Sequence, residues 1–252
     1  EDFSYDINIP RQKISHNLLK LKAFKNFDFG KLVMRYDFQV NDRKEFDIRR
    51  GDRTKPALDL NLQTHSLAFD LESKFQNNSN LKAGISGRYQ KNFPDPSTGV
   101  KRIIPDYKKY DFGIYAISDY RLNERWLIES GIRFDHTSMN VFKFYRTSFW
   151  ESRNYDQLFP ELVVREENVQ TLINPEINFS NFSATFGAKN NSNNHTSFLN
   201  YSIASRAPNP SELFSEGLHH SAARIELGDL SFDSEKSNKL SLTSVSYTHL
   251  RA

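Results

Sequence analysis

The sequence predicts an all-β protein that forms part of an antiparallel transmembrane β-barrel. Three observations favour this fold class: long segments alternate strictly between apolar and polar residues, their connections are alternately short and long, and aromatic residues gather near segment ends. Alternation with a period of two is typical of a strand. Strands of globular proteins run about five or six residues, whereas a tilted membrane-crossing strand needs about nine to eleven. The segments here are of the longer kind.

About nine long strands are expected in chain order. In the second, Leu32, Met34 and Tyr36 alternate with the charged residues Lys31, Arg35 and Asp37, with Val33 as the one exception, and the fourth and sixth show the same pattern. In a barrel, the polar residues expected to face the lumen are Arg35, Asp37, Lys82, Arg88 and Arg133. The third is less regular, because Leu58 and Leu62 fall on one face of an ideal strand whereas Leu67 and Leu71 fall on the other. One extra residue would bring them to the same face, so we expect a β-bulge near Thr64–Ser66. The expected strands are 14–25, 31–40, 57–75, 81–91, 107–121, 125–136, 177–189, 195–206 and 236–246.

The connections between these strands differ in length in a regular way. The short ones are Asn26–Gly30, Gln76–Asn80, Leu122–Glu124 and Asn190–Asn194. The long ones are Asn41–Pro56, Asn92–Asp106, Thr137–Glu176 and Ala207–Glu235. This alternation predicts that all tight turns lie at one rim of the sheet and all long loops at the other, as in outer-membrane barrels.

Alternation alone does not decide which face of the sheet meets lipid. A soluble β-sandwich buries its apolar face, whereas a membrane barrel turns the same face outward. Strand length, loop asymmetry and the aromatic residues favour the barrel, since aromatic rings suit the two membrane interfaces. These aromatic residues are Phe75, Tyr89, Tyr107, Tyr110, Tyr120, Trp126 and Phe134. Packing of Leu32, Ile85, Ile128 and Phe134 against a second layer would indicate the sandwich instead.

Composition narrows the functional classes. The 252 residues contain no apolar run near the roughly 20 residues of a membrane-spanning helix, so a membrane role requires strands. The net charge of +3 and the scattered basic residues give no indication of nucleic-acid binding. The absence of cysteine excludes disulfides, thiolate metal sites and cysteine nucleophiles. Asp135 and His136 lack a nucleophile at a plausible spacing, so we expect neither catalytic residues nor a cofactor.

One segment, from the end of the eighth strand to the start of the ninth, carries a distinctive series of short motifs. They are Arg206 and Pro208; Glu212, Leu213 and Phe214; Gly217 and His219; Glu226, Gly228 and Asp229; and Glu235 with Ser237. A second match is the Gly-Ile-Arg-Phe-Asp run within 129–136. Together these motifs resemble the barrel of TonB-dependent outer-membrane receptors, with Phe232 where that family has leucine.

The local chemistry of that segment is consistent with a strand that stops and a loop that doubles back. Pro208 and Pro210 cannot donate a ladder hydrogen bond, so the strand should end there. Ser211 is the expected N-cap of a short helical turn, and Gly217 and Gly228 are expected to adopt positive φ.

The candidate ligand-binding residues all lie in two long loops or at their edges. Arg206 is within reach of Glu212, Glu226 or Glu235, so a rim salt bridge is favoured over contact with a substrate. The adjacent pair His219 and His220 is a candidate for capturing a metal or haem, although packing or capping is favoured and the metal is unknown.

The loop Thr147–Glu167 offers a second candidate surface. Trp150, Tyr155 and Arg165 could hold a ferric siderophore by stacking and charge. An extended hairpin that packs on itself explains the same residues, and both interpretations stay open here.

The resemblance implies a fragment of a larger transporter. Complete members of the family enclose a 22-stranded barrel with an N-terminal plug and a segment that binds the energy transducer TonB. Residues 1–252 would then be one partial barrel domain without that plug, and an odd number of strands leaves two open edges. The tail 246–252 loses the alternation and is expected to be a truncation or a foreign extension.

The implied function is uptake of a scarce nutrient across the bacterial outer membrane, most often an iron chelate. Zinc, copper or haem are the alternative cargoes, and TonB and outer-membrane lipid are the expected partners. A soluble β-sandwich that acts as a binding module is the alternative from another class.

Overall fold

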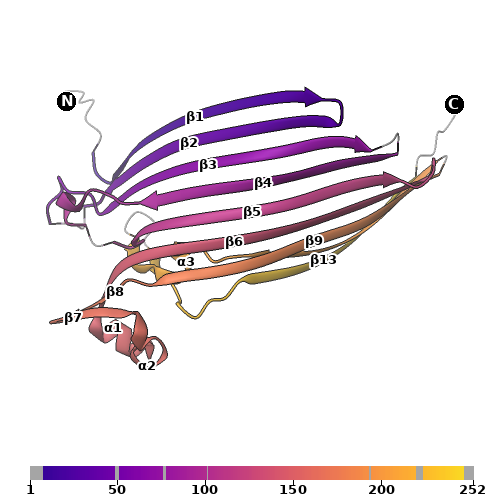
Figure 1. Cartoon of the computed structure of the whole chain (residues 1–252). Coiled ribbons are helices and arrows are strands. Elements are labelled where there is room, and N and C mark those ends of the chain that lie inside the picture. The colour runs from indigo at the N-terminus through magenta and orange to yellow at the C-terminus, as the bar shows by residue number, and fades with distance from the viewer. Residues whose placement is uncertain are drawn as a thin grey trace, which may run out of the picture.

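The computed structural model describes residues 8–48, 51–75, 78–100, 102–192, 194–219 and 224–246. Nine long antiparallel strands form one curved sheet in the order β1-β2-β3-β4-β5-β6-β9-β10-β13 (Figure 1). These strands are β1 (Arg11–Phe27), β2 (Gly30–Phe46), β3 (Leu58–Phe75), β4 (Ser79–Asn92), β5 (Asp106–Arg121), β6 (Trp126–Arg146), β9 (Glu176–Ser192), β10 (His195–Arg206) and β13 (Glu235–Ser246). All nine predicted strands are therefore confirmed. His220 and residues 247–252 of the tail lie outside the described residues.

The predicted difference between the two rims is also confirmed. The connections β1–β2, β3–β4, β5–β6 and β9–β10 are tight turns at one rim, and the long connections carry all the helices at the other (Figure 1). Most strands are longer than the sequence pattern predicted, and β6 reaches 21 residues. The reason is that their ladders continue past the alternating segment into the folded loops.

The loop rim contains several short elements. Between β4 and β5 lies η1 (Pro96–Thr98). Between β6 and β9 lie α1 (Thr147–Ser152), α2 (Tyr155–Leu158), η2 (Pro160–Leu162), β7 (Val163–Glu167) and β8 (Gln170–Ile173). Between β10 and β13 lie α3 (Pro210–Phe214), β11 (Glu216–His219) and β12 (Arg224–Leu227). In the part of the chain that the structure describes, no helix has the length and apolar character needed to cross a membrane.

The outer face of the sheet is apolar and uncovered. Directly paired residues form a row across five strands, Phe69–Ile85–Ile114–Phe134–Phe182. Ile85, Ile114 and Phe134 are 44%, 49% and 42% exposed, and no second layer packs on them among the described residues. The soluble β-sandwich is therefore wrong, because it would bury this row.

The opposite face is polar and lines the concave side. Arg35 and Tyr115 both hydrogen-bond Asp70, Arg88 pairs with Asp111, and Lys82 pairs with Glu72. Because the sheet does not close within residues 8–246, β1 and β13 remain its two edges. The architecture is thus a partial barrel wall with an apolar exterior and a charged lumen.

Two expectations for individual residues are wrong. The pairing of β3 with β2 and β4 runs without a register shift through Thr64–Ser66, so there is no bulge. Instead, Leu58 and Leu62 face the lumen side because the folded loops cover that end of the strand. Tyr107 likewise points inward and is 8% exposed, so it does not belong to an interfacial girdle.

Other aromatic residues do mark the ends of the outer face. Tyr89 and Tyr110 are paired across β4 and β5, with ring centroids 5.0 Å apart, on the side of the long loops. Tyr120 and Trp126 are 48% and 41% exposed on the side of the tight turns. Phe134 lies in the middle of the apolar face rather than at an interface. The side chain of Phe75 is not among those described.

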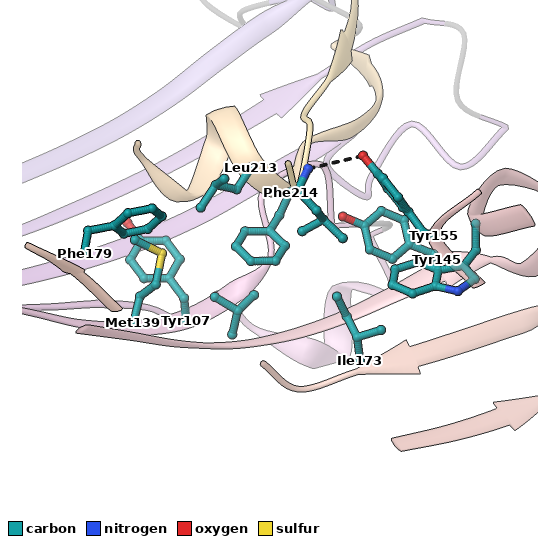
Figure 2. Close-up of a cluster of buried hydrophobic side chains, with 11 residues drawn as sticks. Tyr107, Met139, Tyr145, Tyr155, Ile173, Phe179, Leu213 and Phe214 are labelled. Carbon is teal, nitrogen blue, oxygen red and sulfur yellow. Dashed lines mark hydrogen bonds between the residues drawn. The ribbon is translucent and has the colours of Figure 1, made fainter. Parts of the chain in front are cut away.

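A hydrophobic core of buried side chains lies at the loop rim, on the lumen side of the wall. Figure 2 shows how Leu213 and Phe214 of α3 point down onto residues of the wall and of the β6–β9 connection. The core consists of Tyr107, Met139, Val141, Tyr145, Trp150, Tyr155, Ile173, Phe179, Leu213, Phe214 and Leu230. These side chains hold the two longest loops together as one folded unit above the lumen.

Candidate functional site

The loop that follows β10 begins with a well-anchored helical turn. Asn209 is the N-cap of α3, Pro210 occupies the first turn, and the Glu212 carboxylate accepts a hydrogen bond from the Asn209 backbone N–H at 2.7 Å. Ser211 was expected as the N-cap, which is wrong. The helix starts earlier because proline at the first helical position has a suitable φ and needs no N–H partner.

Arg206 is the centre of a salt-bridge cluster at the rim. Its guanidinium donates two hydrogen bonds to Glu212, both 2.9 Å, and its Nε lies 2.6 Å from Glu235. The bonds from Arg206 and then from the Asn209 N–H lower the pKa of Glu212 to about 2. This confirms the predicted rim salt bridge, with Glu212 and Glu235 as the partners. Contact of Arg206 with a ligand stays a prediction.

Gly228 and Gly217 shape the loop for different reasons. Gly217 has φ +153°, as expected of a glycine at a turning point. Gly228 does not have positive φ, which corrects the prediction. A Cβ at Gly228 would lie 2.5 Å from the Leu213 carbonyl carbon and 2.6 Å from the Phe214 nitrogen, so glycine is required there by close approach of two backbones.

Asp229 connects the two longest loops. It accepts hydrogen bonds from Arg153 at 2.7 Å and from the Tyr155 hydroxyl at 3.2 Å, and the same hydroxyl accepts one from the Leu230 N–H at 3.2 Å. Burial alone would raise the pKa of Asp229, but hydrogen bonds from Ser231 and the charge of Arg153 hold it below its ordinary value. We refer to Arg153, Tyr155, Asp229 and Leu230 as the loop clasp.

The aromatic candidates of the β6–β9 loop belong to its core. Trp150 and Tyr155 are 1% and 2% exposed, and their ring centroids lie 5.2 Å apart (Figure 2 shows Tyr155 beside Tyr145). Trp150 and Tyr155 thus pack in the core that joins this loop to the β10–β13 loop, and contact of this loop with a siderophore stays a prediction. Arg165 lies on β7, more than half exposed, and pairs with Glu167 at 3.0 Å.

His219 lies on β11 between two carboxylates. Its Nδ1 lies 2.9 Å from Glu226 and its Nε2 lies 3.1 Å from Glu45 at the end of β2. The carboxylates approach opposite nitrogens of the ring, so one metal ion cannot contact all three groups. In the described part of the chain, no group of three or more His, Cys, Asp or Glu residues is arranged to hold a metal ion.

A polar cavity of about 440 Å³ lies on the lumen face, next to the strand end that carries Arg206. Sequence reasoning identified Arg88, Arg133 and Arg206 but missed Lys109 and Asn181, whose inward phase along the strands could have identified them. It also missed Ser205, which shares the phase of the outward-facing Tyr201 but donates a hydrogen bond to Asn181 at 2.6 Å. The polar lining residues are Ser66, Ser86, Arg88, Lys109, Asp111, Arg133, Asp135, Thr137, Asn181, Ser205, Arg206 and Asn209.

The cavity contains both positive and negative side chains, and most of them are held in ion pairs with one another. Arg133 donates a hydrogen bond to Asp135 at 2.7 Å. The Asp111 carboxylate accepts hydrogen bonds from Arg88 at 2.8 Å and from Thr137 at 2.7 Å. Such a lining can hold a polar, charged or chelated solute through charge-assisted hydrogen bonds. It is therefore a candidate binding surface on the lumen face.

The two-faced open sheet and its folded loop rim define the class of protein: the wall of a transmembrane β-barrel. The family model described as "TonB dependent receptor-like, beta-barrel" matches residues 2–251. The chain therefore belongs to the TonB-dependent receptor family, whose members are transporters and receptors rather than enzymes.

Solved structures of that class are similar in fold. They include a copper transporter, OprC (TM-score 0.68, 12% identity, 94% of this chain and 37% of that chain). A second is the hemophore receptor HasR of Serratia marcescens (TM-score 0.64, 10% identity, 92% of this chain and 36% of that chain). A third is the closed form of the ferric-catecholate import receptor Fiu of Escherichia coli K12 (TM-score 0.54, 16% identity, 92% of this chain and 38% of that chain). This chain thus spans less than two fifths of these proteins' length. A comparison with curated protein sequences gives no match.

Proposed function

We propose that the protein containing this wall is a TonB-dependent importer of the bacterial outer membrane, and that its cargo is an iron chelate such as a ferric siderophore. The single observation that carries the proposal is the position of the polar cavity. It lies on the lumen face, directly inside the rim where the long loops are folded. A solute captured among those loops would meet this lining first on its way through the barrel.

The chemistry of the cavity supports a charged chelate as cargo. Arg88 and Arg133, whose side chains are about half exposed, supply donors for carboxylate, hydroxamate or catecholate oxygens, whereas Lys109 is buried against Asp111 at 3.2 Å. Guanidinium groups suit such oxygens because they donate two parallel hydrogen bonds. Members of the fold that are named for iron, haem or copper transport are compatible with this cargo class but do not select among its members.

Zinc, copper or haem are the alternative cargoes. The sequence suggested them through His219 and His220. Both ring nitrogens of His219 already lie against carboxylates, which favours a role in holding the β11–β12 hairpin against β2. The metal alternative is therefore the weaker of the two.

Uptake by the full-length protein tests the proposal. Cells of an iron-starved host without its own siderophore receptors should gain growth on ferric siderophores when they express the protein, and should lose that growth when TonB is deleted. The same cells are supplied with haem, zinc and copper as separate arms. Growth or metal accumulation only in one of these arms would replace the iron chelate with that cargo, and uptake without TonB would refute the transporter class.

A matched pair of variants links uptake to the cavity. Arg88→Gln removes a charged donor from the lining, and is expected to weaken chelate binding about tenfold or more. Lys82→Gln is the control, because Lys82 faces the same lumen but pairs with Glu72 outside the cavity. Equal affinity of both variants would show that the cavity does not contact the cargo.

A further inference from the structure

Two lysines on the outer face are placed directly opposite each other. Lys91 of β4 pairs in register with Lys108 of β5, and both side chains point away from the lumen because Gln90 and Lys109 point into it. Like charges directly opposite each other on a sheet destabilise it. Neither lysine has an acidic partner within 4 Å among the described residues, so nothing in this part of the chain neutralises the pair.

The neighbours of the pair are neutral donors and aromatic rings. The register continues the row as Gln63–Lys91–Lys108–Asn140, and the next row toward the membrane centre is His65–Tyr89–Tyr110–Ser138. Lys91 Nζ lies 5.0 Å from the ring centroid of Phe93, and Lys108 is exposed. The nearest acid on the same strand face, Asp106, is bound to Arg102 at 3.1 Å, and Glu176 lies beyond Asn140. The outer face therefore presents two ammonium groups beside two tyrosines.

The height of this row on the wall matches a lipid headgroup. Ile114 lies four residues from Tyr110 and six from Tyr120, so it is close to the middle of the apolar face. Lys108 is six residues from Ile114, which is about 20 Å along the strand and about 14 Å along the membrane normal for a tilt near 45°. Half the hydrocarbon thickness is about 15 Å. The ammonium groups would therefore reach the level where headgroup phosphates begin, just outside the aromatic belt.

We propose that Lys91 and Lys108, supported by Tyr89 and Tyr110, form a binding site on the outer wall for a phosphate group of a membrane lipid headgroup in the leaflet on the loop side. The phosphate lies between the two ammonium groups and removes their repulsion, while its acyl chains cover the apolar rows below. This inference rests on the proposed placement of the protein in the outer membrane.

Lipid binding by the purified full-length protein in detergent tests the site. The probe is an acylated glucosamine disaccharide with two phosphates (lipid A), and bound lipid is counted by native mass spectrometry over a concentration series. The double variant Lys91→Gln, Lys108→Gln is expected to bind this lipid about 10- to 30-fold more weakly than the unchanged protein. The double variant with arginine at both positions should keep the affinity, because it keeps both charges.

Three controls make the outcome decisive. Lys25→Gln should bind as the unchanged protein does, because Lys25 lies on the outer face at the opposite rim. The same lipid without phosphates should bind the unchanged protein as weakly as the glutamine double variant binds the intact lipid. Inorganic phosphate at equal phosphate concentration should not displace the lipid. Undiminished binding by the glutamine variant, equal binding of the lipid without phosphates, or displacement by inorganic phosphate would each overturn the site.

The experiment separates this site from the proposed function. Each variant is first checked for the folded barrel by the heat-dependent shift of its electrophoretic mobility, and for fractionation with the outer membrane. Protein that does not fractionate there would refute the membrane placement itself. Protein that does, but whose lipid affinity does not depend on the two lysines, would refute only the lipid site.

Discussion

Removal of one hydroxyl should loosen the loop clasp without changing the packed core. In Tyr155→Phe the ring and its contacts remain, but Asp229 loses a donor and the buried Leu230 N–H loses its acceptor at 3.2 Å. A buried donor left without a partner costs about 1–3 kcal/mol. Since about 1.4 kcal/mol corresponds to a factor of ten, local opening of the β10–β13 loop should become roughly 5- to 150-fold more frequent.

Hydrogen–deuterium exchange of the full-length protein measures this opening directly. Peptides that contain Leu230 should exchange faster in Tyr155→Phe by that factor, whereas peptides of the long strands should be unchanged. Tyr145→Phe is the matched control, because Tyr145 lies in the same core at 2% exposure and its hydroxyl has no hydrogen bond among the described residues. Exchange at Leu230 that is identical in Tyr155→Phe and the unchanged protein would refute the clasp.

Three other perturbations have defined outcomes. Gly228→Ala should destabilise the loop by about 1–3 kcal/mol, seen as faster proteolysis at the loop rim, because its Cβ would overlap the backbone of α3. Glu212→Gln should weaken the rim cluster by less than about 1 kcal/mol, since Arg206 is half exposed. Because the pKa of Glu212 is lowered to about 2 in the fold, this difference in loop-opening free energy should be complete above about pH 4.5 and disappear as the pH falls toward 2. Ile114→Arg places a charge at the middle of the outer face, and should reduce the free energy of folding into lipid vesicles by about 2–4 kcal/mol, whereas Ile114→Leu should change it little.

Much of the wall could be predicted because its rules are local. Side chains of a strand alternate between two faces, so the sequence alone assigned Leu32 and Ile85 to one face and Arg35 and Arg88 to the other. The lengths of the connections then determined which rim carries the loops. The lengths of the strands were underestimated at the loop rim. There the strands continue beneath a folded loop, so their side chains no longer alternate between water and lipid and the sequence pattern is lost.

The candidate site could be predicted only in part. Proximity of charges along the sequence was enough to pair Arg206 with Glu212, but it could not exclude Glu226, which instead contacts His219. The burial of Trp150 and Tyr155 depends on α3 and Leu230, which lie more than fifty residues away in the sequence. No local pattern indicates that such distant segments meet.

The sequence by itself determined which segments form long strands and which rim carries the long loops, because period-two alternation and turn length act over a few neighbouring residues. The uncovered apolar face, which only the tertiary structure shows, excluded the β-sandwich. Only the tertiary structure decided the faces of Leu58 and Tyr107, the partners of His219 and the register that sets Lys91 against Lys108. Each of these depends on which strand or loop lies alongside. That choice is made by packing across the whole sheet, where shifting a strand by one residue would turn all its side chains to the other face.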